Sequence, residues 1–257
     1  MGCLCESKNN QINQSNQTNQ SQNENKNKEF DSGKMSNYII GEIDINDNNV
    51  NKEIMIINSY EEYHRNWGFK PLEMNKLNEE EIKSCKIRID GVLIPFNYVY
   101  TFHEKKNYTI IYTFENDLTN TNFMFHKCEC LTKLDFSHLN TQNVKSMEGM
   151  FNDCVSLKSL NLSNLNTQNV TNMNHMFYGC ESLTNLDLSS FDTRNTTIMY
   201  SMFEKCKSLT YLNISTFNAE KVDLFDMEDM FGECFSLANQ NIITNDEKIK
   251  YVIQYWK

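Results

Sequence analysis

The sequence predicts an α/β-type repeat solenoid, in which short parallel strands form a right-handed stack. A β-rich N-terminal module and a C-terminal helix are expected to cap its two ends. Three observations lead to this fold class. A pattern of apolar residues recurs every 26 residues through the second half of the chain. Alternating apolar residues precede the repeats, and an amphipathic helical pattern follows them.

Composition excludes two broad classes of protein. The 257 residues carry 24 Lys and Arg against 34 Asp and Glu, which gives a net charge of −10. A nucleic-acid-binding protein needs a basic surface for the phosphates, so the acidic balance argues against one. No apolar run approaches the roughly 18 residues that span a bilayer, so no membrane-spanning helix is expected.

Residues 1–35 are predicted to be an acylated, disordered tether. Removal of Met1 would expose Gly2 for myristoylation, and Cys3 and Cys5 lie close enough to accept palmitoyl groups. Stable anchoring needs two such signals, since one myristoyl chain binds only weakly. Glu6 occupies a position that is usually Ser or Thr, and the alternative is a chance Met-Gly start. Thirteen of the residues 9–28 are Asn or Gln, a composition that cannot form a core.

Residues 36–117 are predicted to form the β-rich module that covers the first repeat. Residues 54–57 predict a buried strand, and Ser59 with Glu62 predicts a capped helix start. The pair Asp90-Gly91 lies between two apolar runs and predicts a hairpin with a type I′ turn. Residues 109–114 predict a further strand.

Residues 118–243 contain the repeats. A Met-Phe pair recurs at intervals of 26, 26, 26 and 28 residues, and a Cys follows each Phe by three residues. The pairs begin at Met124, Met150, Met176, Met202 and Met230. A Leu-x-x-Leu-x-Leu pattern follows, which is typical of leucine-rich-repeat solenoids with one short parallel strand per turn. The final interval indicates a two-residue insertion in the last repeat.

The recurring cysteines are interpreted as buried packing residues. Zinc requires ligands that converge on one point, whereas these thiols are spaced one per repeat. No glycine-rich phosphate loop or His-Glu-x-x-His motif is present, and the histidines fall at variable repeat positions. We therefore expect no catalytic residue, no metal, no cofactor and no small-molecule substrate.

Residues 244–257 predict the C-terminal capping helix. The helix is expected to open near Thr244, with Ile249, Val252, Ile253 and Trp256 on one apolar face.

The repeats resemble a known family. The string from Leu183, Leu-Thr-Asn-Leu-Asp-Leu-Ser-Ser-Phe-Asp-Thr, with Met-Phe-x-x-Cys-x-Ser-Leu around it, is similar to the BspA-like leucine-rich repeats. More narrowly, the repeats resemble the 26-residue lipoprotein-type repeat of protists and some bacteria, over residues 118–237. The resemblance implies adhesion or protein binding at a membrane or cell surface and carries no catalytic residue. Many relatives are secreted or have transmembrane helices, and the start at Met1-Gly2-Cys3 departs from that pattern.

Two groups of residues are candidate partner-binding sites. Solvent-facing strand positions are the usual binding surface of such repeats, although hydrogen-bonded ladders would explain their regularity equally well. These positions are Asp135, Asn161, Asp187 and Asn213. The second group makes the last repeat acidic, either as a docking site for a basic partner or as a solvated face. It consists of Asp223, Asp226, Glu228 and Asp229.

The sequence as a whole predicts a non-enzymatic protein–protein interaction module. Its lipid anchor would hold it to the cytoplasmic face of a plasma or ciliary membrane; without the anchor it would be cytoplasmic. One alternative is an extracellular BspA-like adhesin exported by another route. The other is an enzyme-associated module.

Overall fold

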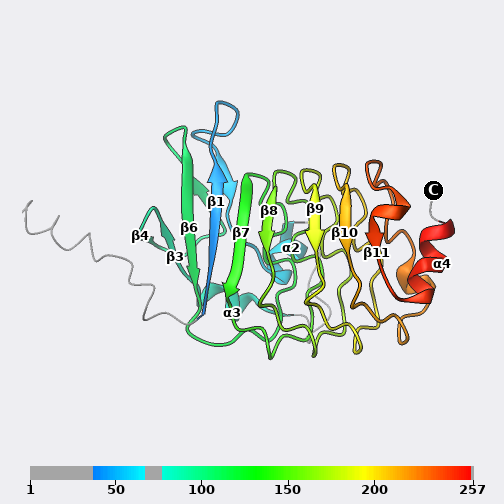
Figure 1. Cartoon of the computed structure of the whole chain (residues 1–257). Helices are drawn as coiled ribbons and strands as arrows, with labels where there is room; N and C mark the ends of the chain where they lie inside the picture. The colour runs from blue at the N-terminus through cyan, green and yellow to red at the C-terminus, as the bar shows by residue number, and fades with distance from the viewer. Residues whose placement is uncertain (1–36, 67–76, 256–257) are drawn as a thin grey trace, which may run out of the picture.

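The computed structural model describes residues 37–66 and 77–255. The molecule is elongated, with the N-terminal sheet at one end, the repeats following one another from β7 to β11, and helix α4 at the other end (Figure 1). The tether predicted for residues 1–35, the acylation sites Gly2, Cys3 and Cys5, and Trp256 lie outside the described residues.

A six-stranded mixed sheet joins the N-terminal module to the first repeats. Its order is β4 (Val92–Ile94), β3 (Lys86–Ile89), β6 (Asn107–Thr113), β1 (Tyr38–Asp44), β7 (Leu131–His138) and β8 (Ser159–Asn161). Strand β1 is antiparallel to both β6 and β7, while β7 and β8 are parallel. The first strand of the repeats therefore has an N-terminal strand as its neighbour.

Two local predictions in this module are confirmed. Asp90 and Gly91 join β3 to β4 with φ of 48° and 80°, the left-handed values that a type I′ turn requires. The Glu62 backbone N–H donates to Ser59 Oγ at 3.1 Å and so caps helix α2 (Tyr60–Asn66). Strand β2 (Glu53–Met55) pairs with β5 (Val99–Thr101), and helix α3 (Glu79–Lys83) precedes β3.

Most of each repeat consists of turns. The later repeats contribute β9 (Asn185–Asp187), β10 (Tyr211–Asn213) and β11 (Ile242–Ile243), which form a second, parallel sheet. Two short 3-10 helices, η3 (Phe225–Met227) and η4 (Asn239–Asn241), lie in the last repeat and after it.

The predicted fold class is wrong. The α/β-type solenoid required one continuous stack of parallel strands, whereas the largest sheet is mixed and mostly antiparallel, and β9–β11 form a separate sheet. The described residues also contain few helices. The physical reason is twofold. The N-terminal module places β1 against β7 in antiparallel register, and turns occupy the segments in which an α/β repeat would place a helix.

The interior of the repeats is built from identical residues in contact with their own kind. The Phe rings that follow each Met stack on the rings of neighbouring repeats, with centroids 5.5 to 6.2 Å apart and planes within 20° of parallel. The recurring cysteines are buried and free, which confirms their interpretation as packing residues. Four of the five thiols also donate to the carbonyl of the Phe in the preceding repeat, at 2.9 to 3.2 Å from Cys154, Cys180, Cys206 and Cys234.

Helix α4 (Glu247–Tyr255) covers the last repeat. Asp246 accepts hydrogen bonds from the Lys248 and Ile249 backbone N–H groups and caps the helix, while its other oxygen accepts from the Ala219 N–H at 2.8 Å. Ile249 and Ile253 are buried beneath the helix, as the helical pattern predicts. Among the residues that the structure describes, no helix has the length and apolar character needed to cross a membrane.

Candidate functional site

Each repeat holds two residues in the left-handed backbone conformation, one just before the Met-Phe pair and one just before the Cys. Their φ values lie between 50° and 69°. Two of them are glycines and three are Asp or His, which tolerate this conformation better than most residues, while the Phe, Ser, Lys and Glu members seldom adopt it. The first set is Phe123, Gly149, His175, Ser201 and Asp229, and the second is Lys127, Asp153, Gly179, Lys205 and Glu233.

Hydrogen bonds in two directions hold this conformation. Alternate residues donate their backbone N–H to the next repeat, for example Phe125 to the Met150 carbonyl at 2.9 Å and Lys127 to the Asn152 carbonyl at 2.9 Å. The residues between these donors form hydrogen-bonded turns along the chain. For example, the His126 N–H donates to the Phe123 carbonyl at 3.0 Å. The polar backbone groups are thereby paired, whichever side chains are present.

Residues beside and at the left-handed positions form what we call the variable face. In each repeat it comprises the two residues before the Met and the two residues after the Phe, which differ in chemistry from repeat to repeat. Helix α2 lies behind β8 and β9, on the side of the molecule away from these strands (Figure 1). It borders the variable face, because both line the same cavity.

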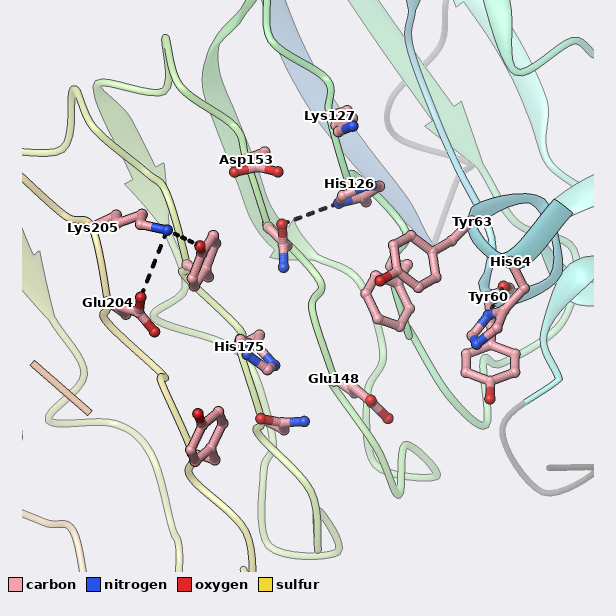
Figure 2. Close-up of a pocket in the computed structure, with 15 residues that line it drawn as sticks. Tyr60, Tyr63, His64, His126, Lys127, Glu148, Asp153, His175, Glu204 and Lys205 are labelled. Carbon is pink, nitrogen blue, oxygen red and sulfur yellow. Dashed lines mark hydrogen bonds and ion pairs between the residues drawn. The ribbon is translucent and has the colours of Figure 1, made fainter. Parts of the chain in front are cut away.

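The variable-face cavity has a volume of about 770 Å³. Aromatic rings, imidazoles, amides and both signs of charge line it, and Figure 2 shows them arranged from α2 across successive repeats. Its walls come from Tyr60, Tyr63 and His64 of α2, and from Phe123, His126, Lys127, Glu148, Asn152, Asp153, Asn174, His175, Tyr178, Tyr200, Glu204 and Lys205 of the repeats.

Aromatic contacts form the end of the cavity at α2. The Tyr63 ring stacks on Phe123 with centroids 4.0 Å apart and planes at 4°, and its edge contacts His126 at 4.8 Å. Nδ1 of His126 lies 3.2 Å from Asn152 Oδ1. Burial, with a contribution from the nearby Lys127 charge, lowers the pKa of His126 to about 4, so its imidazole is neutral at pH 7. Burial also raises the pKa of Tyr63.

The far end of the cavity is formed by two tyrosines and a charged network. The Lys205 ammonium contacts the Tyr178 hydroxyl and lies 3.7 Å from the Glu204 carboxylate (Figure 2). His175 makes edge contacts with both Tyr178 and Tyr200, at centroid distances of 5.5 and 5.4 Å. Burial lowers the pKa of His175.

Two carboxylates lie in the middle of the cavity. Asn172 Nδ2 donates to Glu148 Oε2 at 3.1 Å, and burial raises the pKa of Asp153. The nearby Asn174 Oδ1 is a buried acceptor with no hydrogen-bond partner in the described part of the chain. An unsatisfied acceptor of this kind is one that a donor on a ligand would complete.

The chemistry of the cavity suits binding. Tyrosine and histidine rings offer apolar faces with polar edges, and amides and charged groups offer directional contacts. Within residues 37–66 and 77–255, no three His, Cys, Asp or Glu side chains are grouped so that they could hold a metal ion.

The predicted strand residues lie away from this cavity. Asp135, Asn161, Asp187 and Asn213 stand at equivalent places on β7–β10 or at their ends, and each accepts a hydrogen bond from the backbone N–H two residues later. Asn161 Nδ2 also donates to Asp135 Oδ1 at 2.9 Å. The ladder that explains their regularity is therefore present, and their role in binding stays a prediction.

The acidic candidates of the last repeat lie at its insertion. Asp223, Glu228 and Asp229 are exposed and Asp226 is half-buried. Glu228 and Asp229 line a second, smaller cavity beside α4. The structure thus separates the two predicted groups from each other and from the variable-face cavity, although Glu228 and Asp229 occupy variable-face positions of the last repeat.

Sequence reasoning missed the variable-face cavity. His175 is at a variable repeat position, and that variability served only to argue against catalysis. The available signal was that the positions flanking each Met-Phe pair and Cys all vary, while the Met, Phe and Cys do not. Fixed positions repeat because they pack against each other, and the varying positions between them share one face.

Comparison with known proteins gives one match. Residues 119–245 match the model of a family described as Mycoplasma protein of unknown function, DUF285. This match is consistent with the resemblance to BspA-like surface repeats and does not establish a leucine-rich repeat. No curated protein and no solved structure matches the chain.

Proposed function

We propose that the chain is a BspA-like, non-enzymatic protein-binding module whose contact surface is the variable-face cavity. One observation carries the proposal. The backbone of the repeats is uniform on this face, yet its side chains differ between neighbouring repeats and together line a cavity of about 770 Å³. A repeated frame that presents different residues in a row is suited to recognising a sequence of different residues in a partner.

The dimensions favour a polypeptide segment. Four successive repeats line the cavity, from Phe123 to Lys205. With neighbouring chains about 4.8 Å apart, they extend over about 14 Å. An extended peptide rises about 3.3 Å per residue, so about four of its residues would lie along the cavity.

The residue types also favour a protein partner. Tyrosines are enriched at protein interfaces because they bury a large area with few rotatable bonds, and Tyr63, Tyr178 and Tyr200 are spread along the cavity. Lys127 and Lys205 stand among Glu148, Asp153 and Glu204, so charges of both signs are available to select a partner.

Paired substitutions on opposite faces test this proposal. Tyr178→Ser with Tyr200→Ser removes two rings from the cavity, and the matched control Tyr211→Ser removes a ring that is exposed on β10. Proteins from the native cell that co-purify with the wild-type chain are quantified by mass spectrometry. We expect the double variant to lose a partner that the control retains. Retention by the double variant, with loss by Tyr211→Ser, contradicts the proposal and favours the strand face.

Membrane anchoring is a separate proposal that rests on Gly2, Cys3 and Cys5. Gly2→Ala is expected to release the protein into the soluble fraction, and Cys3→Ser with Cys5→Ser to leave only weak binding, because one acyl chain anchors poorly. Mass spectrometry of the N-terminal peptide and carbonate extraction measure both effects. Occupied glycosylation sites at Asn107, Asn161 or Asn213 would instead support the exported adhesin.

A further inference from the structure

An apolar groove lies between the last repeat and helix α4. Four large side chains border it with 52% to 75% of their surface exposed, whereas the Met and Phe residues of the recurring pairs are buried. These are Leu224 and Phe225 of the last repeat and Tyr251 and Tyr255 of α4. The groove has a volume of about 500 Å³, and Met227 and Phe231 of the repeat interior lie at its base.

The insertion in the last repeat creates the groove. In the three preceding repeats, the next Met comes three positions after the Val or Thr, as from Val170 to Met173. Met227 comes five positions after Val222, and the added length carries η3. The side chains of Leu224 and Phe225 stand on this extra turn and are exposed beside α4. The preceding repeats do not carry the extra residues.

Acidic residues lie in the groove and in the segment beside it, and they have no basic partner among the described residues. Asp223, Asp226, Glu228 and Asp229 all belong to the segment around η3, and none of them forms an ion pair with another described residue. Nearby lysines are engaged elsewhere. Lys248 donates to the carbonyls of Ala219 and Val222, and Lys221 donates to Asn195.

We propose that this groove is a second docking site, and that it binds a partner segment in which apolar side chains are flanked by Lys or Arg. The exposed rings would bury the apolar side chains, and burial of apolar area would supply most of the affinity. The four unpaired carboxylates would attract the flanking basic residues and disfavour acidic segments. This site is distinct from the variable-face cavity in its residues and in the chemistry that it selects.

Two groove variants and two matched controls test the site. Leu224→Ser with Phe225→Ser removes the apolar wall, and its control is Phe235→Ser, which alters a 78% exposed ring outside the groove. The acidic variant converts Asp223, Asp226 and Asp229 to Asn and Glu228 to Gln. Its control converts four exposed glutamates distant from the groove in sequence, Glu53, Glu80, Glu104 and Glu129, to Gln and so makes the same change in net charge.

The experiment is a selection from a library of random short peptides displayed on phage, followed by affinity measurement of the enriched peptides by fluorescence polarisation. With the wild-type protein we expect enrichment of peptides that combine Leu, Phe or Trp with neighbouring Lys or Arg. Both groove variants should weaken binding of these peptides by at least about tenfold, and both controls should leave it unchanged. High salt should weaken binding to the wild type more than to the acidic variant.

Three results would overturn the proposal. The first is no enrichment over the Leu224→Ser/Phe225→Ser protein, and the second is enrichment of acidic or uncharged peptides. The third is equal loss of binding in the groove variant and in its control. Peptides that depend on Tyr178 and Tyr200, and not on Phe225, would support the variable-face cavity alone, so failure of the groove and failure of the cavity are distinguishable. Equal thermal unfolding temperatures show that the variants are folded.

Discussion

The interior and the variable face of the repeats share one backbone, but different features recur in them from repeat to repeat. In the interior the side chains themselves recur, so that Phe stacks on Phe and four of the five Cys thiols reach the preceding repeat. On the variable face only the backbone conformation recurs, with two left-handed residues per repeat whatever the side chain. The difference shows that stability is placed in the repeating interior, which leaves the outer positions free to differ.

This freedom has an energetic cost. A residue other than glycine, Asn or Asp in the left-handed conformation is disfavoured by about 1–2 kcal/mol, and six such residues lie in the repeats beside Asp153 and Asp229. Two ladders of backbone hydrogen bonds hold them there. Strained backbone that is maintained in this way, along a cavity, is what a binding surface is expected to show.

The largest expected effect compares two adjacent residues, Phe177 of the interior and Tyr178 of the variable face. Phe177→Ala should lower the free energy of unfolding by about 4 kcal/mol, because it removes a fully buried ring between two stacked neighbours. Tyr178→Ala should cost about 1 kcal/mol, since the side chain is half-buried. Urea unfolding measures both. Equal losses in the free energy of unfolding would contradict the view that the interior provides the stability and the variable face is free for recognition.

A second prediction concerns His126, a variable-face residue that is buried. Its pKa is lowered from 6.5 to about 4, so the unfolded chain binds this proton more readily than the folded one. Its contribution to stability is therefore present above about pH 6.5 and is lost as the pH falls towards 4, by at most about 3 kcal/mol. Unfolding of the wild type and of His126→Gln is measured from pH 7 to pH 4. A wild-type curve parallel to that of the variant would contradict this account.

Glycines separate the cost of the left-handed conformation from the cost of crowding. At Gly149 an added Cβ would lie 2.5 Å from the Phe123 ring, whereas at Gly91 it would meet nothing within 4 Å. Both residues have positive φ. Gly91→Ala should cost about 1 kcal/mol through conformation alone, and Gly149→Ala about 2–3 kcal/mol because the ring must also move. A Gly149→Ala effect no larger than that of Gly91→Ala would show that the Phe123 ring yields freely.

The smallest expected effect is a gain in stability. Ser201 is left-handed, and its buried hydroxyl has no hydrogen-bond partner among the described residues. Ser201→Gly removes both the strained conformation and the unpaired hydroxyl. We expect the free energy of unfolding to rise by about 1 kcal/mol after the added chain entropy of glycine is subtracted. Asp229→Gly, at the equivalent exposed position, should gain less because no buried hydroxyl is removed. Calorimetry measures both, and a loss of stability at Ser201 would contradict the strain argument.

The sequence predicts those features that neighbouring residues determine. The Asp90-Gly91 turn, the Ser59 cap, the start of α4 and the buried Cys and Phe positions follow from local conformational preference and from the period. The pairing of β1 with β7 could not be predicted in this way, because it joins segments about ninety residues apart. The Leu-x-x-Leu-x-Leu pattern shows which residues are buried and not whether strands or turns connect them.

The candidate site was less predictable than the interior. A left-handed Phe123 or Lys205 leaves no mark in the sequence, because glycine and asparagine are the residues that usually signal this conformation. The exposure of Phe225 could not be predicted from the sequence either. An aromatic residue in a repeat predicts burial, and only the position of α4 relative to the insertion determines where its ring lies.

The hydrogen bonds between repeats have a consequence for how such a chain changes over time. Many of the backbone bonds join residues about 26 positions apart, as from Thr171 to Lys145. Removal or duplication of one 26-residue unit therefore leaves the remaining backbone groups and interior side chains opposite partners of the same kind. A gene that gains or loses such a unit would lengthen or shorten the cavity by about 4.8 Å, which corresponds to about one and a half residues of an extended peptide. The number of repeats would thus set the length of partner that the cavity can contact, without any new kind of contact in the interior.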